Sequence, residues 1–188
     1  MPGDPDNPSG THIRFDSNDG VFAAVEFGYL ATSEEGQAPN KLAIGIWLHT
    51  TETTNIAGET EDQNLGAYLI GESALTETIV GFVQLGATDP SINRIAWYLG
   101  AGATVTGWIP GRPEDKLGLA VGAAINSDDF LDANTGYDRH ETVIECSWEA
   151  ALTETLTLQP DLQYIINPGD SPGTENAFQL GVRATLSY

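Results

Sequence analysis

The sequence is poor in basic residues. Only 7 Lys and Arg stand against 27 Asp and Glu, which gives a formal net charge of -20. A nucleic-acid-binding protein needs a basic surface to neutralise phosphates, so this balance argues strongly against that class of partner. Hydrophobic residues make up 40% of the chain and fall in regular patterns, which also argues against a disordered chain.

Cysteine and histidine are scarce as well. Cys146 is the single cysteine, so neither an intramolecular disulfide nor a Cys-based zinc site can form. The three histidines, His12, His49 and His140, form no pair at the spacing of metal ligands. We therefore expect no metal and no cofactor.

Signatures of catalysis are also missing. The sequence holds no G-x-S-x-G, no H-E-x-x-H and no Gly-Lys-Thr phosphate loop. Glu145 and Glu149 could serve as a carboxylate pair for glycoside hydrolysis, but such pairs arise by chance in so acidic a chain. We expect a protein without enzymatic activity.

Long apolar runs are absent too. No stretch approaches the roughly 20 apolar residues of a transmembrane helix. The segment from Met1 to Pro8 has neither the positive nor the apolar region of a signal peptide, and residues 1–10 are expected to be disordered or linker-like. For an exported protein, this predicts that the sequence lacks its natural beginning.

The dominant positive signal is alternation of apolar and polar residues with period two, between breaks rich in Gly, Pro, Asp and Asn. It predicts an all-β protein, with most strands near the 9–11 residues that cross a membrane at a tilt. About ten strands are expected, at residues 11–16, 21–31, 41–50, 65–75, 79–88, 94–109, 116–126, 140–152, 155–167 and 177–188.

The connections between these strands alternate in length. Residues 153–154 and 76–78 make tight turns, whereas residues 51–64, 127–139 and 167–176 make long polar connections. Outer-membrane barrels have short turns on the periplasmic side and long loops outside, so the three long segments are expected at one end.

The two faces of each strand differ in polarity. Between residues 141 and 149 one face would carry Glu141, Glu145 and Glu149, opposite Ile144 and other apolar residues. Three carboxylates need water or cations, which predicts either outside solvent or a wet barrel lumen. The last strand alternates up to an aromatic residue, Tyr188, and resembles the recognition strand of bacterial outer-membrane barrels.

Several motifs then resemble the carbohydrate-selective porin family. They are Gly107-Trp-Ile-Pro-Gly-Arg-Pro-Glu-Asp-Lys-Leu-Gly-Leu-Ala120, Leu158-Gln-Pro-Asp-Leu-Gln-Tyr164, and the strands at 41–50 and 81–86. The resemblance covers the chain from about residue 20. It implies a sixteen-stranded outer-membrane β-barrel, usually trimeric, through which glucose and related sugars diffuse passively. With about ten strands, this chain matches only the C-terminal half.

The residues expected to line the lumen and contact sugars share polar or aromatic side chains on the non-lipid face. They are Trp47, His49, Glu141, Glu145, Glu149, Gln159, Asp161, Gln163 and Arg183. A second group, Arg112, Glu114 and Asp115, lies in a turn that is expected at the periplasmic rim; it either stabilises that turn or contacts passing solute. Pro160 predicts a bulge or a strand edge.

Residues 1–188 are interpreted as a single barrel region, with small neutral sugars, outer-membrane lipid and further copies of the chain as partners. Two alternatives remain open. A soluble, secreted β-sandwich that binds carbohydrate would need no detergent. A small structural barrel without a pore would have a lumen filled by interlocked side chains.

Overall fold

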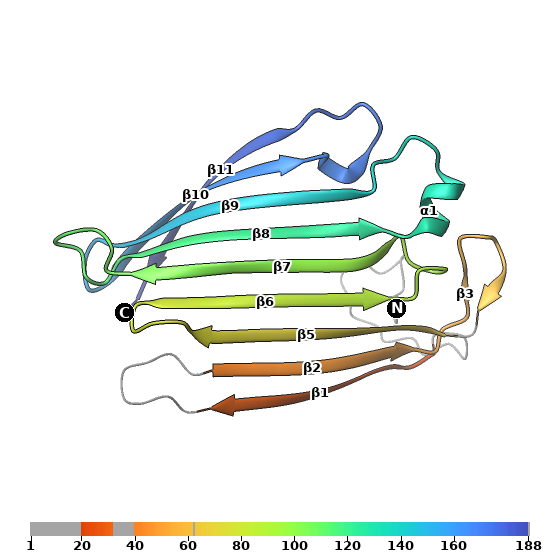
Figure 1. The fold of residues 1–188 in the computed structure, drawn as a ribbon, viewed down its shortest axis with the longest axis horizontal. Helices are drawn as coiled ribbons and strands as arrows, with labels where there is room; N and C mark the ends of the chain where they lie inside the picture. Colours follow the sequence, from red (N-terminus) through yellow and green to blue (C-terminus); the bar gives the residue numbers. More distant parts are fainter. Residues whose placement is uncertain (1–19, 32–39, 62, 188) are drawn as a thin grey trace, which may run out of the picture.

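The computed structural model describes residues 20–31, 40–61 and 63–187, most of which form one antiparallel sheet (Figure 1). Nine strands pair in the order β1-β2-β5-β6-β7-β8-β9-β10-β11, so each lies beside its neighbours along the chain. The strands are β1 (Phe22–Ala31), β2 (Asn40–His49), β5 (Asn64–Ala74), β6 (Ile79–Thr88), β7 (Ile95–Thr106), β8 (Lys116–Asn126), β9 (His140–Ala151), β10 (Leu156–Ile166) and β11 (Ala177–Leu186).

These nine strands confirm nine of the ten predicted from alternation, and the predicted strand at 11–16 lies outside the described residues, as does the segment 1–10. Four short elements were not predicted, and all of them lie within the long connections. They are the hairpin strands β3 (Thr53–Thr54) and β4 (Thr60–Glu61), the helix α1 (Asp128–Ala133) and the 3-10 turn η1 (Pro168–Asp170).

The prediction that the long connections lie together at one end of the sheet is confirmed. The segments 50–61, 89–94, 127–139 and 167–176 lie at one end of the sheet, called here the loop end (Figure 1). The connections 75–78, 107–115 and 152–155 lie at the other, called the turn end. All pairings in the main sheet are antiparallel, which fixes this alternation.

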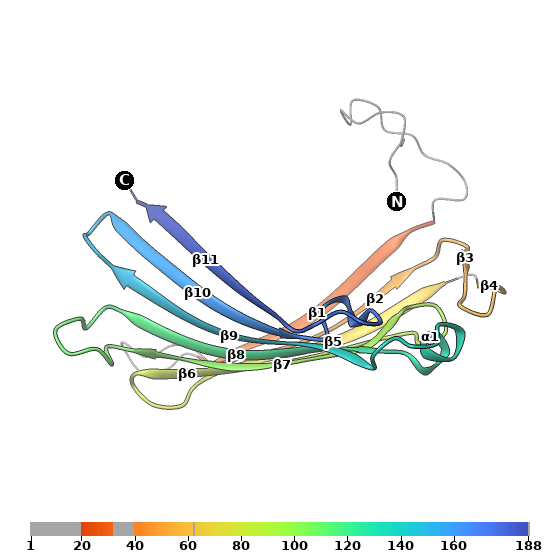
Figure 2. The same cartoon turned by 90° about the horizontal axis from the view of Figure 1, so that it is seen from above.

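The sheet is strongly curved. In Figure 2, β1 and β11 both rise on the same side of the middle strands and cross in projection. Within the described residues β1 and β11 are the two edges, and nine antiparallel strands make them run in the same direction. A wholly antiparallel barrel that includes this sheet therefore needs an odd number of further strands between them.

No second layer covers the sheet among the described residues. The fully buried apolar side chains found there are three alanines, Ala43, Ala96 and Ala150. A soluble domain buries one apolar face of each sheet against another layer. One sheet without such a core excludes the β-sandwich alternative.

The expectation for Pro160 was wrong. Pro160 pairs with Val182 of β11 and sits inside the sheet, between two neighbouring strands. On the other side, Leu158 pairs with Ala150 of β9 and Asp161 pairs with Ser147. The step from one pair to the next is three residues on both strands, so neither strand has the extra residue of a bulge. The missing N–H leaves a local gap in the ladder, and the register continues on both sides of it.

Candidate functional site

Charge divides the two faces of the sheet completely. Residues paired directly across neighbouring strands share a face, and faces alternate along each strand. Following the registers from β1 to β11 places every Asp, Glu, Lys and Arg of the nine long strands on one face, called here the polar face. These residues are Glu26, Lys41, Glu72, Lys116, Glu141, Glu145, Glu149, Asp161 and Arg183.

The opposite face, called here the apolar face, carries large exposed hydrophobic side chains on every strand. They include Phe27 at 74% exposure, Ile46 at 60% and Leu180 at 82%. Exposed large hydrophobic residues are much rarer on the strands of the polar face, where Phe22, Leu30 and Tyr98 are the examples. Soluble proteins do not expose so continuous an apolar surface, so this face requires an apolar surrounding.

The polar face is the concave one. On β2, Ala43 of the polar face is 0% exposed, whereas its neighbours Leu42 and Ile44 on the apolar face are 50% and 54% exposed. Curvature crowds side chains on the inside of a sheet and spreads them on the outside. The polar face therefore forms the inner wall.

All nine residues predicted to line the lumen lie on the polar face. Seven of them lie on three adjacent strands: Glu141, Glu145 and Glu149 on β9, Gln159, Asp161 and Gln163 on β10, and Arg183 on β11. The other two, Trp47 and His49, lie on β2, separated by several strands, near the loop end. The structure thus gathers one group and leaves the second on a distant part of the wall.

The carboxylates of β9 all have polar partners. Glu145 accepts a hydrogen bond from Gln163 Nε2 at 2.8 Å, and Glu149 pairs with Lys116 Nζ at 2.9 Å. Glu141 accepts a hydrogen bond from the backbone N–H of Gly169 in the loop after β10. Each of these partly buried carboxylates is therefore hydrogen-bonded at the inner surface and remains in reach of water.

The β2 residues are held differently. Trp47 stacks against Phe22 with ring centroids 6.1 Å apart, and His49 Nε2 shares a hydrogen bond with Thr51 Oγ1 at 2.8 Å. The indole ring also lies over the backbone of Gly66, where a Cβ would come within 2.5 Å of the ring. Glycine at that position lets the tryptophan lie flat against the wall.

The same arrangement recurs on the middle strands, where no lumen residue was predicted. Phe82 of β6 covers Gly102, and Tyr98 of β7 lies beside Gly100 and Gly122. Tyr68 covers Gly45 and donates a hydrogen bond to Glu26 at 2.7 Å. These strands looked merely glycine-rich in the sequence. The signal that was available is the pairing of an aromatic residue on one strand with glycine on the next, which requires the register to be known.

Between these aromatic residues the polar face is hollowed. A depression of about 220 Å³ lies over the small residues Ala120 and Gly122 of β8, with aromatic rings, an amide and a carboxylate around it. Its lining includes Phe82, Gln84, Tyr98, Gly122, Val143 and Glu145. Ring faces beside an amide and a carboxylate match the mixed apolar and hydroxylated surface of a sugar.

The predicted turn group forms a compact cluster at the turn end. Asp115 is 3% exposed and accepts hydrogen bonds from Arg112 Nε, from Trp148 Nε1 at 2.8 Å and from the backbone N–H of Ala151 at 3.2 Å. The Arg112 hydrogen bond is the main reason that the pKa of Asp115 is lowered, against the opposing effect of burial, and it also raises the pKa of Arg112. Glu114 is exposed beside them.

This turn cluster fastens one hairpin to the next. Arg112 also donates to the carbonyl of Ala151 at 3.2 Å and lies 5.6 Å from the Trp148 ring. Gly107, at φ 72°, closes the turn by donating to the Asp115 carbonyl at 2.8 Å. These contacts support turn stabilisation, the first of the two interpretations of Arg112 and Asp115.

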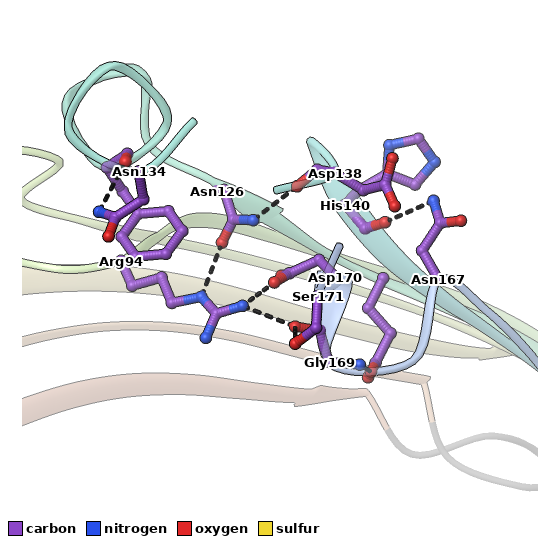
Figure 3. Close-up of polar contacts among 11 residues, drawn as sticks. Arg94, Asn126, Asn134, Asp138, His140, Asn167, Gly169, Asp170 and Ser171 are labelled. Carbon is purple, nitrogen blue, oxygen red and sulfur yellow. Dashed lines mark hydrogen bonds and ion pairs between the residues drawn. The ribbon is translucent and has the colours of Figure 1, made fainter. Parts of the chain in front are cut away.

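The loop end holds a second arginine cluster that the sequence did not indicate (Figure 3). Arg94 donates to Asn126 Oδ1 at 3.2 Å and to the Gly169 carbonyl at 2.7 Å, and it pairs with Asp170, which is 2% exposed. Its guanidinium also lies 4.7 Å from the Phe130 ring and 5.2 Å from the Tyr137 ring. One side chain therefore ties together the connections after β6, β8 and β10.

A comparison with protein families decides the assignment: the model of the carbohydrate-selective porin, OprB family, matches residues 2–188. The chain belongs to this family. The porin is 25% identical to Porin B of Pseudomonas aeruginosa over 119 aligned residues, which cover 54% of this chain and 26% of that protein.

A solved structure agrees with the fold. The high pH structure of Pseudomonas putida OprB matches 96% of this chain and 50% of that chain, with a TM-score of 0.81 and 19% identity. The chain thus spans about half of that structure and about a quarter of Porin B. The likeness confirms the predicted fold class, an antiparallel transmembrane β-barrel, of which the sheet is a section of wall.

Membership in a porin family implies an outer-membrane location. No helix in the described part of the chain is long and apolar enough to cross a membrane. Across residues 20–31, 40–61 and 63–187, no three His, Cys, Asp or Glu side chains come together in a way that could hold a metal ion.

Proposed function

We propose that the intact porin lets small neutral sugars, glucose among them, diffuse passively across the outer membrane. In this proposal residues 1–188 form a single barrel region, whose polar face lines a water-filled channel while its apolar face meets lipid. The separation of all strand charges onto one face is the observation that carries the proposal. Such a separation is expected where one face of the sheet contacts water and the other contacts lipid.

The composition of the polar face favours neutral solutes over anions. Its strands carry six carboxylates and three basic groups. Fixed negative charge along a channel wall repels anions, and neutral sugars pass without that penalty. The proposal assigns Trp47, His49, Glu141, Glu145, Glu149, Gln159, Asp161, Gln163 and Arg183 to this wall, with Phe82, Gln84 and Tyr98 added from the structure.

Sugar preference would come from the hollow between Phe82 and Tyr98. Weak contacts with ring faces and with Gln84 and Glu145 hold a sugar briefly and release it, as passage requires. Tight binding would stall transport. The middle strands therefore contribute more to selectivity than their plain sequence suggests.

Liposome swelling with the intact porin tests the proposal, using two variants at adjacent positions of β7. Tyr98→Ala removes a ring from the polar face, and Leu99→Ala removes an apolar side chain of similar size from the opposite face. Tyr98→Ala is expected to lower the ratio of glucose flux to the flux of a similarly sized non-sugar solute by about two- to tenfold, the value of one aromatic contact. Leu99→Ala should leave this ratio unchanged.

Three outcomes would contradict parts of the proposal. Equal permeation by glucose and by an anion of similar size would remove the selectivity. Equal effects of Tyr98→Ala and Leu99→Ala would remove the role of the hollow. Absence of any solute flux through a folded, inserted protein would favour the structural barrel without a pore.

The intact porin is further proposed to be a trimer, as the family resemblance implied. Native mass spectrometry of the protein purified in mild detergent tests this, because a trimer has three times the mass of one chain. A single-chain mass would contradict it.

A further inference from the structure

The apolar face is not uniformly filled. Near the turn end, the neighbouring strands β5 to β7 carry the small residues Gly71, Gly81 and Ala101 close together on this face. A hollow of about 560 Å³ lies there, with Tyr29, Leu42, Leu75 and Val83 among its lining residues. This volume falls within the range of about 300–1,000 Å³ that ligand sites occupy.

The hollow opens away from the channel. Tyr29, Leu42 and Leu75 at its rim are 68%, 50% and 64% exposed, so these side chains project from the sheet. A Cβ added to Gly71 would stand 3.2 Å from Val83 Cγ2, and one added to Gly81 would stand 3.0 Å from Leu75 Cδ1. Side chains at these glycines would therefore extend into the hollow and fill it.

We propose that this hollow binds one acyl chain of a phospholipid, lying along the strands on the outside of the barrel. The proposal goes beyond sugar transport and rests only on the placement of the apolar face in lipid. That face carries no charged residue on its strands, and in a membrane the surface that is continuous with it is covered by hydrocarbon. Away from one polar edge the wall of the hollow is apolar and offers ordered water no partners, so an acyl chain is the occupant that fits.

A polar pair marks where the ester end of the lipid would lie. Ser73 Oγ donates to Asn40 Oδ1 at 2.7 Å at the edge of the hollow nearest the turns. The backbone N–H of Ala74 donates to the same oxygen at 3.2 Å, which fixes the orientation of the Asn40 amide. Within the described part of the chain, the Asn40 NH₂ group then has no acceptor. In this proposal it donates to an ester carbonyl or a phosphate oxygen of the lipid.

Lipid titration of the intact porin tests the inference. Palmitoyl-oleoyl phosphatidylethanolamine is added to the detergent-purified protein, and bound lipids are counted by native mass spectrometry. Gly71→Phe fills the hollow. Ala67→Phe is the matched control, since Ala67 lies on the same strand and the same face, outside the hollow.

Gly71→Phe is expected to weaken binding of the first lipid by about tenfold, whereas Ala67→Phe binds as the wild type does. Asn40→Leu should weaken it less, because the acyl contacts remain. If Gly71→Phe does not fold, Ala101→Leu makes a smaller change in the same hollow and carries the same expectation.

Unchanged lipid binding in a folded Gly71→Phe would overturn the inference, as would an equal loss in Ala67→Phe. If Gly71→Phe instead dissociated the assembly and left the lipid count unchanged, the hollow would belong to a contact between copies, and the inference would be wrong. Glucose flux measured on the same variants separates the two proposals, since sugar transport can persist without a lipid in this hollow.

Discussion

The two ends of the sheet use the same chemistry over very different distances along the chain. Each end has an arginine that lies over aromatic rings and pairs with a buried aspartate: Arg94 with Asp170 at the loop end, and Arg112 with Asp115 at the turn end. Arg112 and Asp115 are three residues apart, whereas Arg94 reaches Asn126 and Gly169, 32 and 75 residues away. The Arg112–Asp115 pair can therefore form locally, but the Arg94 contacts require the four strands β7 to β10 to be in place.

This difference suggests what each cluster does. The turn cluster shapes one connection and joins it to the neighbouring hairpin through Ala151. The loop cluster fixes three connections relative to one another, and those connections lie at the mouth of the proposed channel. Breaking the loop cluster should release more of the chain than breaking the turn cluster.

The largest effect is expected from Arg94→Ala. It leaves the buried Asp170 carboxylate without its cation. Loss of one partner of a fully buried ion pair costs about 3–5 kcal/mol, and the cost here should lie at or below the lower end of that range because the Arg94 side chain is 41% exposed. The loops would open locally while the sheet remains. Hydrogen exchange of the amides of Ser127 and Asp138, which close these loops by bonding to Arg94 and Asp170 carbonyls, should become up to about a hundredfold faster.

Arg139→Ala is the matched control for that experiment. Arg139 pairs with Asp128 in the connection after β8, but both side chains are well exposed, so the pair contributes only about 0–1 kcal/mol. If amide exchange became faster by the same factor in both variants, Arg94 would stabilise the loops no more than an exposed ion pair does.

Asp115→Asn should have a smaller effect that depends on pH. Because the folded pKa of Asp115 lies below its ordinary value of 3.8, its charge stabilises the fold above that value, and this stabilisation is lost as the pH falls through the folded pKa. The variant should unfold at lower denaturant than the wild type at pH 7. The difference should shrink as the pH is lowered from about 5 to 2.

Glu114→Gln is the control at the neighbouring position, where the carboxylate is exposed. It should leave both the unfolding midpoint at pH 7 and its decline with acid close to those of the wild type. A constant gap between Asp115→Asn and the wild type across this pH range would show that another property of Asp115, not its charge, stabilises the turn.

The sequence predicted what depends on local alternation and missed what depends on register. Glu141, Glu145 and Glu149 fall on one face by spacing alone, so β9 was assigned correctly. The wall aromatics Phe82 and Tyr98 were missed because their role depends on which glycine lies across the strand boundary. Pro160 was misjudged because the sheet tolerates one absent N–H where the other neighbour, β11, keeps its pairing.

The Arg94 cluster was beyond prediction for a related reason. Arg94 and its partners lie in three connections and at the end of β8. These connections show no periodic pattern, and they meet only because the antiparallel order brings every second connection to the same end. By contrast, the Arg112–Asp115 pair at the turn end lies within one sequence motif, so these two residues could be named together from the start.

The smallest effect is expected from a variant at the loop end that removes a ring contact of Arg94 and keeps its ion pair with Asp170. Phe130→Leu removes the ring that lies 4.7 Å from the Arg94 guanidinium but leaves Asp170 and Tyr137 in place. Its cost should be about 0.5–1 kcal/mol, the value of a partly exposed cation–π contact, seen as a few-fold faster exchange of the Ser127 and Asp138 amides. Phe130→Tyr keeps a ring at this position and should exchange as the wild type does. Should Phe130→Leu match Arg94→Ala, the rings would be the main support of the loop end, and the likeness between the two arginine–aspartate pairs would be incidental.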